Sequence, residues 1–206
     1  MKVHKHVLYL ASSSKSRQML LRESLIPFLV IGHGADEDAV DQTLPFTQRL
    51  QEIARKKMEH AVLPEVGLEG QEIFVLAVDT MGQDSKGVVH GKPKDREDAI
   101  HKIKTLGESS TTATAMCLDK KQWFDGRWQT MGRLEQVVET RYRFVVPEPW
   151  MNRYLENSWA MIASGAIAVE LYGAQFLEWI DGSYSGVVGL PMYELRQSLE
   201  KLGFFE

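Results

Sequence analysis

The chain has 206 residues, of which 44% are hydrophobic and 25% are charged, and its formal net charge is −4. This composition is typical of a globular protein, and the negative charge argues against broad binding to nucleic acid or to a membrane surface. The single cysteine, Cys117, excludes an intramolecular disulfide and favours a reducing compartment. No stretch approaches the ~20 apolar residues of a membrane helix, and no secretory leader is recognisable. We therefore expect a cytoplasmic protein.

The first motif joins a short apolar strand at residues 7–11 to a helix through three serines. A serine at such a junction can cap the helix, and the helix dipole then attracts an anion to the same end. Arg17 falls in the first helical turn, where its guanidinium reaches the same space. Ser12, Ser14 and Arg17 therefore form a candidate phosphate site. A simple capped helix with a surface arginine is the alternative.

A second strand is predicted at residues 27–31, followed by a glycine-flanked loop at 32–34 and an acidic cluster that contains Glu37. Ligands commonly bind at such strand ends in α/β sheets, although a solvated acidic loop is the alternative. Residues 47–62 show the periodicity of an amphipathic helix. Lys57 falls near its apolar face, so we expect the ammonium group either to reach water along the surface or to meet an anion such as phosphate.

The longest apolar run, residues 73–78, ends at Asp79-Thr80. Such a run is typical of a central strand that is covered on both faces. Active-site residues of α/β enzymes commonly lie at the ends of such strands, so Asp79 is a candidate functional carboxylate. The alternative is that Asp79 caps a turn. Further along, a glycine and a proline flank Lys92 and are expected to hold it in a rigid bend.

The remaining elements alternate between strands and helices. Strands are predicted at 88–89, 109–118, 136–146 and 175–180, and helices at 96–106, 150–157 and 192–202. A hairpin or loop is expected over residues 120–132, and a small-residue loop at 164–173 carries Glu170. This alternation indicates the α/β class.

Six motifs, in this order, resemble the Maf family of nucleoside triphosphate pyrophosphatases, also described as septum-formation inhibitors. They are LASSSKSRQMLL at 10–21, ADE at 35–37, IARKK at 53–57, VDT at 78–80, GKP at 91–93 and VVGLP at 187–191. The resemblance covers nearly the whole chain. It implies one domain over residues 1–206, with an elongated, bent mixed β-sheet flanked by helices and a cleft between two lobes. It also implies a housecleaning activity that hydrolyses a modified or surplus triphosphate to monophosphate and pyrophosphate.

The resemblance assigns roles by position. It implies that Asp79 activates water, that Glu37 and Asp79 hold a divalent metal, and that Lys57 and Lys92 are the two catalytic lysines. The metal is expected to be Mg²⁺, with Mn²⁺ as the alternative. Ser12 and Arg17 match the phosphate-binding loop, and Ser14 lies between them as a further candidate for binding the substrate. These assignments agree with the chemistry, because Mg²⁺ prefers one or two carboxylates plus phosphate oxygens, and cations offset charge on a leaving pyrophosphate.

The sequence does not decide which base the substrate nucleotide carries. Ser16, Thr80 and Glu170 match positions linked to base choice in the family. Thr80 is similar to the subgroup that prefers dTTP and UTP, whereas Glu170 is similar to the subgroup that prefers 7-methyl-GTP.

Two other functions are weighed against this hypothesis. The first is a non-catalytic regulator that binds a nucleotide or a cell-division partner, and the second is a pyrophosphatase of the inosine-triphosphate type. The retained set of Asp79, Glu37, Lys57 and Lys92 argues against the regulator, and the motif order argues against the inosine type. Whether two copies pair as a homodimer is left open.

Overall fold

The computed structural model describes residues 6–107 and 109–206. The strands are β1 Leu8–Ala11, β2 Phe28–Val30, β3 Glu72–Gln83, β4 Val89–His90, β5 Ser110–Phe124, β6 Arg127–Phe144 and β7 Leu177–Asp181. The α-helices are α1 Lys15–Glu23, α2 Phe46–Glu59, α3 Arg96–Leu106, α4 Met151–Asn157, α5 Tyr184–Val188 and α6 Met192–Lys201. Short 3-10 helices are η1 Glu148–Trp150, η2 Ala160–Ile162, η3 Ser164–Ala166 and η4 Leu171–Phe176. No helix in the described ranges is long and apolar enough to span a membrane.

The strands form a mixed sheet in the order β2-β1-β3-β5-β6-β7, with β4 paired to β3. This arrangement confirms the predicted α/β class with a mixed sheet flanked by helices. The described residues divide into two compact units. Unit 1 lies within Met1–Asp79, Ala115–Val137 and Met192–Glu206, and unit 2 within Thr80–Thr114 and Val138–Pro191.

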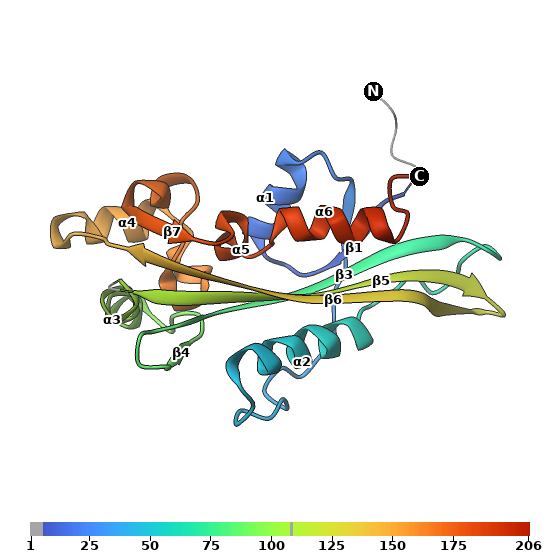
Figure 1. Ribbon diagram of the computed structural model, residues 1–206, viewed down its shortest axis with the longest axis horizontal. Helices are drawn as coiled ribbons and strands as arrows, with labels where there is room; N and C mark the ends of the chain where they lie inside the picture. Colours follow the sequence, from blue (N-terminus) through green and yellow to red (C-terminus); the bar gives the residue numbers. More distant parts are fainter. Residues whose placement is uncertain (1–5, 108) are drawn as a thin grey trace. The chain divides into compact units, whose positions relative to one another are not determined.

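In unit 1, β1 lies parallel between β2 and β3, with Leu10 opposite Val30 and Ala11 opposite Ala77. The chain runs from β1 outward to β2 and then back across to β3. Because such crossovers are right-handed, they place α1 and α2 on opposite faces of the sheet, as Figure 1 shows. Residues 73–78 are covered on both faces and are almost fully buried, which explains their apolar run. The order reverses at β1, so its carboxyl end is a topological switch point, where ligands bind in α/β sheets.

Strand β3 is longer than the sequence predicts. The prediction ends the strand at Asp79, but β3 continues to Gln83 because its last residues pair antiparallel with β4. Gly82 lies opposite His90, and Gln83 lies opposite Val89. The prediction of a strand end at Asp79 is therefore wrong, and the carboxylate projects from within a strand.

Residues 120–132 form the hairpin alternative rather than a loop. The turn between β5 and β6 is Asp125-Gly126, with φ of 50° and 73°, which matches the two-residue turn that Asp-Gly favours. Trp123 and Trp128 pack edge to face with ring centroids 5.2 Å apart. Trp128 Nε1 also donates a hydrogen bond to the Pro64 carbonyl oxygen at 2.8 Å, so the hairpin base is fixed to the preceding loop.

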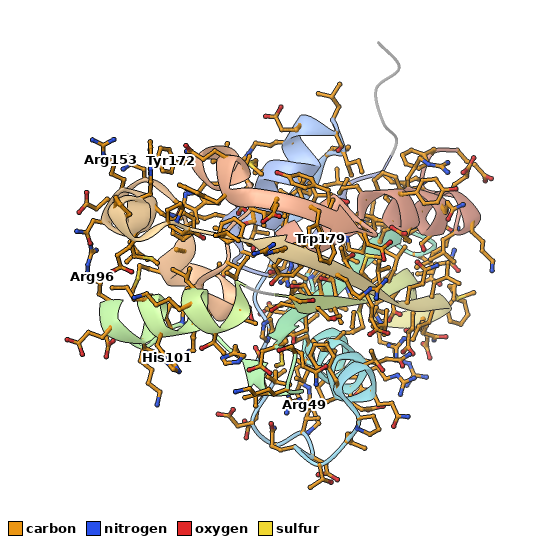
Figure 2. The ribbon with its side chains drawn as sticks, turned by 60° about the vertical axis from the view of Figure 1, so that its left-hand side comes forward. Arg49, Arg96, His101, Arg153, Tyr172 and Trp179 are labelled. Carbon is orange, nitrogen blue, oxygen red and sulfur yellow. The ribbon has the colours of Figure 1, made fainter. Side chains whose placement is uncertain are left out.

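Unit 2 surrounds an aromatic core with α3, α4 and the 3-10 helices. The rings of Tyr154 and Phe176 lie 5.5 Å apart in an edge-to-face contact. Arg96 on α3 donates to Asn152 on α4 at 2.7 Å, and this bond joins the amino-terminal ends of the two helices. Figure 2 shows Arg96 and Arg153 on the same side of this unit. The core and the α3–α4 link fix the segments that carry the candidate residues of unit 2.

The segment before η4 folds tightly against α4. The Tyr154 hydroxyl donates to the Ala166 carbonyl oxygen at 2.9 Å and accepts from the Ala168 N–H at 2.8 Å. A Cβ atom at Gly173 would lie 1.7 Å from the Ala168 carbonyl oxygen. This close approach of two backbone segments requires glycine.

Gly173→Ala is therefore expected to lower the free energy of unfolding by about 3 kcal/mol, because the backbone of this buried segment must move. Urea unfolding measures the change. Gly34→Ala serves as the control, since a Cβ atom there meets nothing within 4 Å. Equal unfolding midpoints for the two variants would contradict the prediction.

Candidate active site

The first part of the site is the turn from β1 to α1. Ser14 caps α1 by accepting a hydrogen bond from the Arg17 N–H at 3.4 Å. The Arg17 guanidinium folds back and donates to Ser12 Oγ at 2.8 Å. Arg17 is only 8% exposed, so the alternative of a surface arginine is wrong. Ser16 lies half-buried in the same first turn.

The second part is a group of charges around the buried Lys57, which lies in the last turn of α2. Lys57 is 6% exposed, and its Nζ lies 2.6 Å from Asp79 Oδ1 and 3.1 Å from Glu37 Oε2. The alternative of a lysine that reaches water is therefore wrong. The ammonium does meet anions, and these are two carboxylates of the protein. The structure thus brings together three residues that the sequence places 20 or so positions apart.

The other oxygen of Asp79 has different surroundings. Asp79 Oδ2 is buried and accepts no hydrogen bond from the described residues. Leaving a buried carboxylate oxygen without a partner is costly, so this atom suits a ligand, a cation or a proton donor. Asp79 and Glu37 fit the donor set of Mg²⁺, which needs only one or two carboxylates beside substrate oxygens and water. Within the described ranges, no three His, Cys, Asp or Glu side chains form a metal site by themselves.

Electrostatics link the two parts. Burial lowers the pKa of Arg17 from its ordinary value, and the charges of Asp79 and Glu37 partly offset this effect. An arginine guanidinium nevertheless stays charged in proteins. Unit 1 therefore holds two buried cations, Arg17 and Lys57, within electrostatic reach of two carboxylates at the carboxyl edge of the parallel strands.

His33 belongs to the same group, and the sequence motifs did not single it out. The Gly34 N–H donates to the His60 carbonyl oxygen at 3.0 Å and fixes the loop against the end of α2. The pKa of His33 is lowered, first by burial and then by the charge of Lys57, so the ring is neutral near pH 7. The sequence does hold one signal for His33, which is its position between two glycines after a predicted strand.

Three predicted site residues lie in unit 2. Thr80 Oγ1 lies 2.8 Å from Thr114 Oγ1, which donates to the Gly186 carbonyl oxygen at 2.8 Å, so Thr80 is part of a hydrogen-bonded chain. Glu170 is 5% exposed and directly precedes η4. Lys92 is exposed, and its ammonium group has no hydrogen bond or ion pair with another described residue.

Cys117 takes no part in this chemistry. The residue is 1% exposed, and burial raises the pKa of its thiol to about 12. The thiol therefore stays protonated near neutral pH and is a poor nucleophile.

Comparison with known proteins gives consistent matches. A family model described as Maf-like protein matches residues 7–202. A dTTP/UTP pyrophosphatase of Caldicellulosiruptor bescii is 30% identical over 96% of this chain and 95% of the relative. A dTTP/UTP pyrophosphatase of Fusobacterium nucleatum is 30% identical over 95% of both chains. A nucleoside triphosphate pyrophosphatase of a Ruegeria species is 30% identical over 98% of both chains.

Proposed function

Because the chain belongs to the Maf-like protein family, we propose that it hydrolyses dTTP and UTP to the monophosphate and pyrophosphate. Two relatives described as dTTP/UTP pyrophosphatases support this substrate class. The observation that carries the proposal is the buried Asp79 carboxylate, which Lys57 binds at one oxygen and to which no described residue donates a hydrogen bond at the other. A purely nucleotide-binding regulator would not need this arrangement, so the non-catalytic alternative is not favoured.

Asp79 is the proposed general base. Lys57 fixes the carboxylate through Oδ1, which leaves Oδ2 to accept the proton of the attacking water. The water oxygen forms a bond to phosphorus, and the anhydride bond between the monophosphate and the pyrophosphate breaks. Arg17 and Lys57 offset the negative charge that grows on the phosphate oxygens.

A divalent cation is the proposed cofactor, with Mg²⁺ preferred over Mn²⁺. Glu37 and Asp79 would hold it together with substrate oxygens and water. When bound, the cation withdraws charge from the phosphate oxygens. The two carboxylates already share Lys57, so one positive charge of the protein offsets half of their negative charge before any cation binds.

The remaining predicted residues are proposed to contact the substrate. Ser12 and Ser14 with the N–H groups of α1 bind phosphate oxygens, and Lys92 pairs with the leaving pyrophosphate. Ser16 and Thr80 contribute to base choice. Glu170 is proposed to accept the ring N–H of the base. Thymine, uracil and guanine all present such a donor, so the preference for dTTP and UTP is supported by the relatives rather than by this residue. The whole chain is proposed to act as one domain in the cytoplasm, without nucleic acid or membrane as a partner.

Pyrophosphate release from a nucleotide panel with Mg²⁺ tests the proposal. The panel contains dTTP, UTP, CTP, GTP, ITP and 7-methyl-GTP, each also measured with excess EDTA. We expect kcat/KM for dTTP and UTP to exceed the other values by about 10-fold or more, the discrimination that base contacts can supply, and EDTA to abolish release. A preference for 7-methyl-GTP or ITP would overturn the base assignment, and no release from any nucleotide would overturn the activity.

A further inference from the structure

The backbone that carries Lys92 is held in an unusual way. Three consecutive carbonyl oxygens, those of residues 90–92, each accept a hydrogen bond from a donor elsewhere in unit 2. The donors are Ser164 Oγ at 2.7 Å, the Gly165 N–H at 3.0 Å and Lys102 Nζ at 2.9 Å. Two separate elements, η3 and α3, therefore hold this short segment.

The start of the segment is fixed by a buried pair of side chains. His90 Nε2 lies 2.9 Å from Asp84 Oδ2, and both residues are less than 10% exposed. The other oxygen of Asp84 accepts the N–H groups of Lys86 and Val88, each at 2.9 Å. The β3–β4 hairpin is thereby closed by side chains as well as by its backbone ladder, and the position of residue 90 is set.

The end of the segment is fixed by Asp98 on α3. One carboxylate oxygen, Asp98 Oδ2, accepts from Lys102 Nζ at 2.7 Å and from the Lys94 N–H at 2.8 Å. The Lys102 side chain is 12% exposed, so its ammonium is held in place between Asp98 and the Lys92 carbonyl oxygen. Pro93 restricts the backbone between these contacts.

The Ser164 hydroxyl satisfies the carbonyl oxygen of the buried His90. Burial does not require the bond from Lys102, because Lys92 is exposed and water could satisfy its carbonyl oxygen. The fold instead orders the Lys102 side chain against Lys92, at a cost in conformational entropy. The residue so fixed carries an ammonium group that binds no described residue. A rigid backbone beneath an unpaired cation is the arrangement that presents this cation to an anionic ligand at low entropic cost.

We propose that Ser164 and Lys102 are positioning residues that hold the Lys92 ammonium for a phosphate oxygen of the substrate. The inference rests on the proposed pyrophosphatase function and on the role of Lys92 in it. Neither Ser164 nor Lys102 needs to touch the nucleotide, because each acts through the backbone of residues 90–92.

A double-mutant cycle tests this inference. Ser164→Ala and Lys102→Met are each made in the wild-type chain and in Lys92→Ala, and kcat and KM for dTTP are measured. Each single variant is expected to lower kcat/KM about 10-fold, in line with the cost of a small misplacement. In the Lys92→Ala background the same changes are expected to have less than about a twofold further effect, because their target is gone. Lys102→Arg, which keeps a cationic donor at this position, is expected to retain most of the wild-type kcat/KM.

Lys104→Met is the matched control, because Lys104 lies on the same helix and pairs only with the exposed Glu148 among the described residues. Its activity is expected to stay unchanged. Hydrogen exchange of the Lys94 and Gly165 amides, which donate to Asp98 Oδ2 and to the Gly91 carbonyl oxygen, is expected to quicken in Ser164→Ala and Lys102→Met. The positioning role would be overturned if Ser164→Ala and Lys102→Met lowered kcat/KM by the same factor in Lys92→Ala as in the wild-type chain. It would also be overturned if amide exchange did not change. Neither result would contradict the activity of the wild-type chain. An inactive wild-type chain would overturn the proposed function itself.

Discussion

Asp79→Asn is expected to lower kcat for pyrophosphate release by about 10²–10⁴-fold, the usual contribution of a general base. The amide keeps the size of the side chain but cannot take a proton from water. KM is expected to change little, since Arg17 and Lys57 remain to bind phosphate. Steady-state kinetics with dTTP and Mg²⁺, together with thermal unfolding of the same samples, measures both effects.

Asp119→Asn provides the matched control. Asp119 is also a fully buried carboxylate on a strand of unit 1, but it pairs with Arg133 at 2.7 Å and with Lys121 at 2.7 Å. Its neutralisation is expected to lower stability and to leave kcat of the folded protein within about twofold, because a broken ion-pair network affects folding rather than chemistry. Equal losses of kcat in the two variants would show that Asp79 acts only through stability.

Local sequence patterns predicted the parts of the site that depend on neighbours along the chain. The strand–serine–helix pattern correctly predicted a serine cap, which is Ser14, and placed Arg17 in the first helical turn, because capping acts within one turn. The apolar stripe of α2 placed Lys57 near the buried face and left open whether its ammonium would reach water or meet an anion. The unbroken run at residues 73–78 correctly indicated a strand covered on both faces.

Features that depend on distant pairing could not be read in this way. The extension of β3 past Asp79 depends on its antiparallel partner β4. The pattern of apolar residues along the sequence does not indicate that the two strands pair. Periodicity likewise could not show that the anions around Lys57 would be Glu37 and Asp79. His33 was missed because a single histidine in a glycine-flanked loop has no pattern until the fold brings Lys57 beside it.

The pair formed by Lys57 and Asp79 allows stability and catalysis to be separated. Lys57→Met removes the cation and leaves a 6% exposed carboxylate without its partner. We expect the free energy of unfolding to fall by about 3 kcal/mol, the cost of breaking a buried ion pair from one side. We also expect kcat to fall by about 10²–10³-fold, because one group that stabilises charge in the transition state is lost.

The double variant Lys57→Met with Asp79→Asn distinguishes the two effects. With both charges removed, Glu37 is the one carboxylate of the group left without Lys57, and its side chain is 42% exposed to water, so stability is expected to recover most of the loss. Activity is not expected to recover, because the base and the cation are both absent. Lys56→Met is the control, since the Lys56 ammonium is exposed and bonds only the Ala39 carbonyl oxygen among the described residues. Urea unfolding and dTTP turnover are measured on Lys57→Met, Asp79→Asn, the double variant and Lys56→Met. Near-normal turnover in Lys57→Met would show that Lys57 serves the fold alone, and a double variant as unstable as Lys57→Met would show that the destabilisation does not come from the unpaired charge.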